Sequence, residues 1–323
     1  MANQLAHIKW VTVVGDTTPL GKAVVEALIP HPGYVLRVLR PVSSEEPVAQ
    51  PYIVVDRVPD DWDSEMTMDA LSASHAVVNC LDVTWENRWK HHRVAEAAFR
   101  GEVSRYIPAT FGSVDCRNQQ ARRALKLYEE KYKLLKYVKD KALGPDNIIE
   151  HPDGSLTRPF SWTSIVTGLF LDRGIKDRSL SIDPALRRIG IFDGGYTYCS
   201  YSTVCLAAAA VLRVLDNPDK TKNKVVHVQS FCVSQDELKA SLERVTHEQW
   251  TPVKMGPLVY TPFLVNLAQN DHFGATQILN HVVGVAEGEY ATESGLDMSE
   301  LGMPMQMEPL DYVVRKALEL EGN

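Results

Sequence analysis

Two glycines six positions apart, Gly15 and Gly21, flank a short polar loop that could bind a phosphate group. A β-branched run at residues 11–14 precedes the loop and apolar residues at helical spacing follow it, so it joins a strand to a helix N-terminus. Backbone N–H groups and the positive end of a helix dipole bind phosphate at such a position. The loop is therefore a candidate for binding the pyrophosphate of a dinucleotide, and a purely structural turn is the alternative. It consists of Gly15, Asp16, Thr17, Thr18, Pro19, Leu20 and Gly21.

Two residues of this loop depart from what close phosphate binding favours. A glycine at position 18 would let the backbone approach a pyrophosphate, whereas Thr18 places a branched side chain there. Pro19 lacks one N–H donor, although proline is well tolerated in the first turn of a helix. We therefore expect the affinity for the cofactor to be reduced.

The second candidate strand, residues 34–39, is followed directly by Arg40. In dinucleotide-binding folds an acidic residue at this position hydrogen-bonds the ribose of NAD, whereas an arginine accommodates the additional 2′-phosphate of NADP. A solvated arginine at a strand end is the alternative interpretation. The position of Arg40 predicts NADP(H) as the cofactor.

Strands and helices alternate through the first half of the chain and must position these residues. Further strands are predicted at residues 52–55, 75–81, 103–108 and 162–167, and helices after the glycine loop and at residues 87–100 and 119–143. Residues 144–158 are predicted as an inserted loop. The second half predicts strands within 179–191 and at 224–228, and helices at 204–215, at 234–244 with a Ser234–Glu237 capping box, and at 313–320. The alternation predicts an α/β fold with a parallel sheet covered on both faces.

The composition excludes several classes of protein. The 323 residues carry 34 Lys and Arg against 41 Asp and Glu, a formal charge of −7, which argues against general nucleic-acid binding. The longest apolar run, residues 204–212, is shorter than the roughly 20 residues of a membrane span. Five scattered cysteines and the lack of an apolar leader in residues 1–10 predict a cytoplasmic protein. The sequence has no serine-hydrolase motif. The adjacent side chains of His91 and His92 point in different directions, so we expect no shared metal site there.

Residues 103–112, VSRYIPATFG, resemble the VKRFIPSEFG segment of the NmrA-like and isoflavone-reductase-like family, a group of atypical short-chain dehydrogenases. Other segments match in the same order: the glycine loop, Arg40, the helix around Lys131, and residues 162–170, WTSIVTGLF, which are similar to WTxIxxGxF of fungal members. Residues 193–212 and the pair Asn217-Pro218 resemble the later region of these proteins. The likeness spans about residues 8 to 250.

The resemblance implies a Rossmann-type, doubly wound NADP(H)-binding domain in residues 1–170, completed by part of residues 180–230, and a smaller C-terminal α/β substrate domain in residues 171–323. It implies that Lys131 hydrogen-bonds the nicotinamide ribose and stabilises an oxyanion as hydride arrives. Ala109 and Thr110 replace a serine and an acidic residue that are usual in the family. Besides the loop and Arg40, the expected cofactor-binding residues are Asn79, Cys80, Leu81, Ala109, Thr110, Phe111, Lys131 and Gly168.

Tyr132 and Lys136 also fit the Tyr-x-x-x-Lys spacing of the better-known short-chain dehydrogenases, in which the lysine lowers the pKa of the phenol so that it can exchange a proton. Tyr137 and Lys141 share this spacing, and a charged helix face in solvent explains both pairs. We take Lys131 and Tyr132 as the catalytic candidates. The expected substrate-binding residues are Phe111, Tyr132 and Phe170, which could form an aromatic wall for a planar molecule. Ordinary core packing is the alternative explanation for these aromatic side chains.

The resemblance thus implies an NADP(H)-dependent oxidoreductase that transfers hydride to or from a small aromatic or alkaloid-like metabolite of specialised metabolism. The expected partner is a small-molecule substrate, and the protein could also form a homodimer. We expect no binding to nucleic acid or to a membrane. Two alternatives stay open. Thr18 and Ala109 favour a non-catalytic regulator that binds the dinucleotide and a protein partner, and the same fold could also carry out a non-redox isomerisation or cyclisation.

Overall fold

The protein is described by a computed structural model that covers residues 8–44, 52–84, 86–148, 158–256, 265–266, 273–287, 295–304 and 308–320. The chain forms two compact units, and each consists of three separate stretches of sequence. Unit 1 comprises Met1–Thr110, Glu130–Ile165 and Ala208–Val226. Unit 2 comprises Phe111–Glu129, Val166–Ala207 and His227–Asn323.

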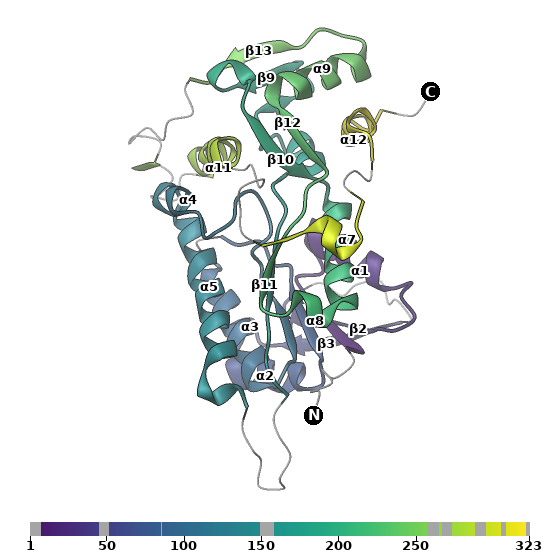
Figure 1. Ribbon diagram of the computed structural model, residues 1–323, viewed down its shortest axis with the longest axis vertical. Coiled ribbons are helices and arrows are strands. Elements are labelled where there is room, and N and C mark those ends of the chain that lie inside the picture. Colours follow the sequence, from purple (N-terminus) through teal and green to yellow (C-terminus); the bar gives the residue numbers. More distant parts are fainter. Residues whose placement is uncertain are drawn as a thin grey trace, which may run out of the picture. The chain divides into compact units, whose positions relative to one another are not determined.

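Unit 1 is built on a parallel sheet with the strand order β3-β2-β1-β4-β5, of which β2 and β3 are labelled in Figure 1. The order reverses at β1, where Val14 lies opposite Leu39 of β2 on one side and Asn79 of β4 on the other. The carboxyl ends of these three strands therefore meet at one edge, which is where open α/β sheets bind ligands. The strands are β1 (Trp10–Val14), β2 (Val35–Pro41), β3 (Ile53–Val58), β4 (Ala76–Asn79) and β5 (Arg105–Ile107).

The sheet of unit 1 continues beyond β5 through later parts of the chain. Trp162 forms a parallel bridge with Tyr106, and β6 (Thr163–Val166) then lies beside β11 (Lys224–His227). Buried Arg105 joins these parts: it donates to the hydroxyls of Ser161 (2.9 Å), Thr163 (3.0 Å) and Thr221 (2.9 Å) and to the carbonyl oxygen of Pro218 (2.6 Å). Burial lowers the pKa of the Arg105 guanidinium to about 10.

Helices connect the strands of unit 1. α1 follows the glycine loop directly, α2 packs against α3, and the rings of His92 in α3 and Tyr137 in α5 meet edge to face with centroids 5.9 Å apart. The helices of this part of the chain are α1 (Pro19–Leu28), α2 (Ser64–Ser72), α3 (Arg88–Arg100), α5 (Lys126–Leu143), a 3₁₀ turn at Pro145–Asn147, α7 (Val204–Asp216) and α8 (Pro218–Thr221).

The described residues of unit 2 include two small sheets and a separate core. β10 (Tyr198–Ser202) lies between antiparallel β12 (Phe231–Ser234) and parallel β7 (Leu169–Phe170). β9 (Arg188–Ile191) lies between β8 (Ile182–Asp183) and β13 (Thr251–Lys254). Apolar side chains around Tyr201, Leu242 and Trp250 form the core. Its other elements are α4 (Gln119–Ala124), α6 (Leu171–Lys176), α9 (Gln235–Thr246), α11 (Phe273–Glu287), α12 (Leu310–Ala317), β14 (Leu296–Asp297) and 3₁₀ turns at Asp193–Gly195 and Met298–Leu301.

The structure confirms the α/β class, the parallel sheet and the Ser234–Glu237 capping box, and it corrects several predicted elements. The single helix predicted at residues 119–143 is wrong, because Leu125 adopts an extended conformation (φ −130°, ψ 125°) that separates α4 from α5. The last helix begins at Leu310 and ends at Ala317, earlier than predicted. The patterns also miss α2, β10 and β12. Part of the predicted loop at 144–158, residues 149–157, lies outside the described residues.

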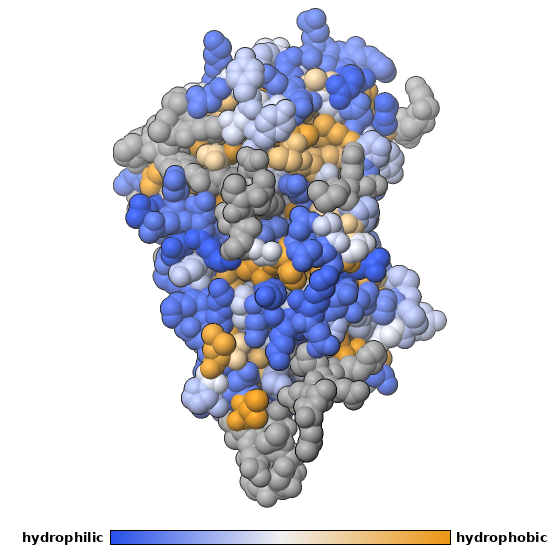
Figure 2. All heavy atoms as spheres, viewed as in Figure 1, coloured by the Kyte–Doolittle hydropathy of each residue, from blue (hydrophilic) through white to orange (hydrophobic). Residues whose placement is uncertain are grey.

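Hydrophilic side chains cover most of the visible face in Figure 2, with apolar side chains in smaller patches. Within the described ranges, no helix combines the length and the apolar character that a membrane crossing requires.

Candidate functional site

Gly15 and Gly21 allow the loop after β1 to pack tightly against the end of the sheet. Gly15 has a φ of +83°, which favours glycine, and a Cβ atom there would lie 2.7 Å from the backbone nitrogen of Leu81. A Cβ atom on Gly21 would overlap the carbonyl oxygen of Gly15. Both positions therefore need glycine for the first turn of α1 to approach the end of β1, as a dinucleotide-binding loop requires.

Thr18 closes this loop with its side chain. Its hydroxyl accepts a hydrogen bond from the N–H of Gly21 (3.0 Å), which caps α1, and it lies 2.9 Å from the carbonyl oxygens of both Gly15 and Cys80. The branched side chain that departs from the usual glycine thus holds the loop against the end of β4. This cap satisfies one of the N–H groups that every helix leaves unpaired at its first turn.

Three backbone N–H groups of the loop have no acceptor among the residues that the structure describes. They belong to Asp16, Thr17 and Leu20, whereas the N–H of Thr18 donates to Gly15 (3.0 Å) and Pro19 has none. Unpaired N–H groups at the N-terminus of a ten-residue helix can bind an anion. The loop therefore fits the pyrophosphate of a dinucleotide.

Arg40 and Asp16 form a buried ion pair at the same edge of the sheet. The Nε atom of Arg40 lies 3.0 Å from both carboxylate oxygens of Asp16, and its Nη2 atom also contacts Oδ2. Each residue is only 8% exposed. Because Val14 pairs with Leu39, the strand register brings the residues that follow them together. The arginine is therefore not the exposed strand-end side chain that the sequence allows as an alternative.

Asn79 anchors a buried polar cluster at the end of β4. Its amide nitrogen lies 3.3 Å from Nδ1 of His91 and donates to the hydroxyl of Tyr106 (3.1 Å), and its carbonyl oxygen accepts from the N–H of Leu81 (3.2 Å). Cys80 is buried beside it, and burial, followed by the charge of Asp16, raises the pKa of its thiol. The hydrogen bonds of Asn79 thus stabilise the carboxyl end of β4. The raised pKa keeps Cys80 a neutral thiol.

Lys131 is buried in α5, 7% exposed, and close to His91. Burial is the main cause that lowers the pKa of His91 to about 4, and the nearby His92 and Lys131 act in the same direction. His91 is therefore neutral at pH 7, so it adds no second positive charge next to the buried ammonium group of Lys131. The sequence suggests His91 only as a possible metal ligand. Its proximity to Lys131 could not be predicted, because the two residues are 40 positions apart and no local pattern connects them.

The two Tyr-x-x-x-Lys pairs differ in their surroundings. Tyr132 is half-buried, but Lys136 is exposed and pairs with Asp140 at 2.6 Å. Burial raises the pKa of Tyr137 to about 12, and the ammonium of Lys141 lies 5.7 Å from the centre of its ring. Lys131 is thus the buried lysine among these candidates, whereas Lys136 contacts solvent.

Ala109 and Thr110 follow β5 and are both buried. The hydroxyl of Thr110 lies 2.8 Å from that of Ser164 in β6. This pair of hydroxyls retains hydrogen-bonding capacity where the resemblance leads us to expect a serine and an acidic residue.

Three predicted residues belong to unit 2, whereas the others named above belong to unit 1. Phe111 is buried, and Phe170 is half-buried directly before α6. Gly168 has a φ of +68°, and a Cβ atom there would overlap the carbonyl oxygen of Ser200. Local packing therefore explains why this position is a glycine.

Unit 2 also contains a buried charged cluster that the sequence patterns do not predict. Asp115 lies 3.2 Å from Nε2 of His227 and accepts a 2.8 Å hydrogen bond from Nε of Arg117. These bonds outweigh burial and hold the pKa of the Asp115 carboxyl well below its usual value. The cluster joins residues 112 positions apart.

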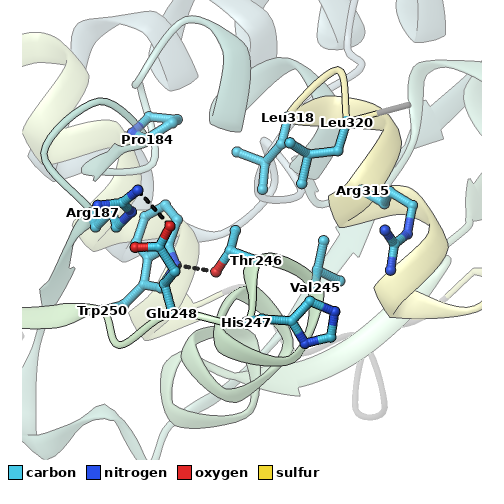
Figure 3. A pocket seen from close by; sticks show the side chains of 10 residues that line it. All are labelled: Pro184, Arg187, Val245, Thr246, His247, Glu248, Trp250, Arg315, Leu318 and Leu320. Carbon is cyan, nitrogen blue, oxygen red and sulfur yellow. Dashed lines mark hydrogen bonds and ion pairs between the residues drawn. The ribbon is translucent and has the colours of Figure 1, made fainter. Parts of the chain in front are cut away.

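A pocket with a volume of about 600 Å³ lies in unit 2, at the end of α9. Figure 3 shows the side chains that line it. Arg187 pairs with Glu248 at its rim, and the indole of Trp250 donates to Thr246. None of the predicted site residues lines this pocket. Among the described residues, no group of three or more His, Cys, Asp or Glu side chains could hold a metal ion.

Comparison with known proteins agrees with this architecture. No protein-family model matches the chain. The oxidoreductase aprR of Aspergillus flavus is 27% identical over 241 residues, which cover 74% of this chain and 75% of that protein. The crystal structure of isoflavone reductase superposes with a TM-score of 0.72 at 16% identity and covers 96% of this chain and 99% of the other. The structure of AtPrR2 with NADP⁺ and (+)pinoresinol gives a TM-score of 0.74 at 17% identity with the same coverage.

These likenesses confirm the resemblance inferred from the sequence. The chain is a Rossmann-type α/β protein. More particularly, it has the fold of isoflavone reductase and its structural neighbours, and its curated relative supports an oxidoreductase on this fold.

Proposed function

We propose that the protein is an oxidoreductase that transfers hydride between a nicotinamide dinucleotide and a small aromatic metabolite. The observation that carries this proposal is the loop at the carboxyl edge of the sheet, where Gly15 and Gly21 allow close approach and three N–H groups are available. The aprR relative is named an oxidoreductase, and the structural neighbours include reductases described with NADP⁺ or NADPH. These names support the class of reaction and the class of cofactor.

The residues of unit 1 suit defined parts of such a reaction. The loop would bind the pyrophosphate through backbone N–H groups, and Thr18 keeps the loop in place by capping α1. A bound nicotinamide would supply or accept the hydride. Lys131 would hydrogen-bond the nicotinamide ribose and stabilise negative charge on the substrate oxygen, because a buried ammonium acts more strongly than an exposed one. Tyr132, half-buried beside it in the chain, is the candidate for exchanging a proton.

The proposed substrate is a small aromatic or alkaloid-like metabolite. The AtPrR2 structure is described with (+)pinoresinol, and other neighbours are a leucoanthocyanidin reductase and an isoflavone reductase. Among the aromatic candidates, Tyr132, which follows Lys131 in unit 1, is the residue proposed to contact the substrate. We also propose that the protein acts in the cytoplasm and in specialised metabolism.

Titration of the purified protein with NADPH, NADP⁺, NADH and NAD⁺ by calorimetry tests the proposal. We expect micromolar binding of at least one dinucleotide, followed by its consumption when aromatic carbonyl or alkene compounds are added. Binding without consumption of cofactor by any substrate would favour a regulator. Product formation without a net change in cofactor would favour an isomerase or cyclase, and the absence of all dinucleotide binding would contradict the proposal.

A further inference from the structure

The edge of Arg40 that would bind a 2′-phosphate is already occupied by a carboxylate of the same chain. Arginine binds phosphate through two N–H donors in a fixed geometry. In this protein, Nε of Arg40 lies 3.0 Å from both oxygens of Asp16, and Nη2 contacts the same group. Asp16 lies in the glycine loop, directly after Gly15, so it cannot move far without displacing the loop itself.

Burial makes this pair costly to open. Both residues are 8% exposed, and separating a buried pair leaves an uncompensated charge on each side. A 2′-phosphate, which carries a charge of about −1.5 to −2, would enter next to the Asp16 carboxylate. The repulsion between these two anions is strong where water is largely excluded.

The neighbouring arginines are also engaged with the protein. Arg37 on β2 pairs with Asp56 of β3 at 2.7 Å. Arg57, which lies opposite Arg40 in the strand register, donates to the carbonyl oxygens of Pro41 (3.1 Å) and Ser44 (3.0 Å) and to the Ser44 hydroxyl (2.8 Å). β2 and β3 therefore carry three arginines, Arg37, Arg40 and Arg57, and each has an acceptor within the chain.

We propose that Asp16 is a specificity-determining residue that selects against the 2′-phosphate, so that the protein binds NAD(H) at least as tightly as NADP(H). This inference rests on the proposed function. It reverses the preference that Arg40 alone predicts, because the sequence rule considers the residue at the strand end and not the acid that faces it from the loop.

Calorimetric titration with NADH and NADPH tests the inference in the wild-type protein and in Asp16→Asn. The preference is the ratio of the Kd for NADH to the Kd for NADPH. We expect a wild-type ratio of one or less and a rise of at least tenfold in Asp16→Asn, because the amide keeps the shape of the side chain and removes its charge. Asp56→Asn is the matched control, since it breaks the neighbouring Arg37 pair outside the loop and should leave the ratio unchanged.

A second measurement does not depend on the folding of a variant. The wild-type protein is titrated with 2′,5′-ADP and with ADP, which differ only in the 2′-phosphate. We expect 2′,5′-ADP to bind no more tightly than ADP.

A wild-type preference for NADPH or for 2′,5′-ADP, or a rise of less than tenfold in folded Asp16→Asn, would overturn the inference while leaving the proposed function intact. If no dinucleotide binds at all, the proposed function fails and the inference fails with it.

Discussion

Lys131 differs from the other lysines of its helix because it is buried, whereas Lys133 and Lys136 are exposed and pair with Glu130 and Asp140. Replacing Lys131 by methionine keeps a long side chain and removes the charge. If the proposed function holds, we expect turnover to fall by roughly 100-fold or more, the size of effect that a single charge-stabilising group gives, with the fold preserved. Steady-state kinetics together with circular dichroism measure this.

Lys133→Met is the control for this prediction, since Lys133 is exposed on the same helix and lies outside the proposed machinery. Its turnover should match the wild type. Equal turnover in Lys131→Met and the wild type would remove Lys131 from the mechanism.

His91 makes the stability of the protein depend on pH. Burial lowers its pKa to about 4 from the usual 6.5, so the unfolded chain binds a proton in this interval and the folded protein does not. Stability is therefore greatest above pH 6.5 and falls as the pH drops toward 4, by about 3 kcal/mol for this residue. His281 in unit 2, whose pKa burial also lowers to about 4, acts in the same direction.

Urea unfolding at pH 7 and pH 5, followed by tryptophan fluorescence, measures this dependence. In His91→Gln the difference in unfolding free energy between the two pH values should become smaller without vanishing, because His281 and His92 still contribute. An unchanged difference would show that His91 does not control it.

At the scale of the elements, the junction of β1 and α1 depends on Gly21. A methyl group there would overlap the carbonyl oxygen of Gly15, and because this atom is backbone it cannot move aside alone. We expect Gly21→Ala to lower stability by about 2 kcal/mol or more and to abolish dinucleotide binding. Thermal unfolding and calorimetry measure the two effects.

Gly33→Ala provides the comparison, since a Cβ atom at that position would meet only the ring of His31, at 3.1 Å. Its binding should stay close to that of the wild type. Retained binding in Gly21→Ala would mean that the loop is not the cofactor site.

The elements that the sequence predicts best are those with local signals. The β-branched run before Gly15 and the Ser234–Glu237 capping box identify β1 and the start of α9. The break between α4 and α5 has no such signal, because Leu125 is neither proline nor glycine and leaves the helical conformation within a continuous polar pattern.

The predicted site follows the same rule. The loop can be found from the spacing of its glycines, and Arg40 from its place after a strand. Their interaction cannot, because the partnership of Arg40 with Asp16 depends on the register of β1 against β2 over 24 positions. The proximity of His91 to Lys131 likewise arises from helix packing, which no local pattern records.

At the scale of the whole molecule, the units do not correspond to halves of the chain. Unit 1 takes its last stretch from Ala208–Val226, which supplies Thr221 and Pro218 to Arg105 and β11 to the side of β6. We expect a fragment that ends at residue 170 to unfold without a cooperative transition, because it buries the Arg105 cation with two of its four acceptors absent. Circular dichroism during heating measures this.

Addition of a peptide that spans residues 204–228 is the matched test, and it should restore part of the cooperative transition. A fragment that unfolds as sharply as the intact protein would contradict the expectation.

The same interleaving has a consequence for folding during synthesis. Arg105 leaves the ribosome 116 residues before Thr221, which at roughly 5–20 residues per second is a delay on the order of ten seconds. During this time the nascent chain carries a β5 strand whose charged residue has no complete set of acceptors. Factors that shield emerging chains would therefore have a defined interval of action, and a slow codon cluster before residue 221 would lengthen it.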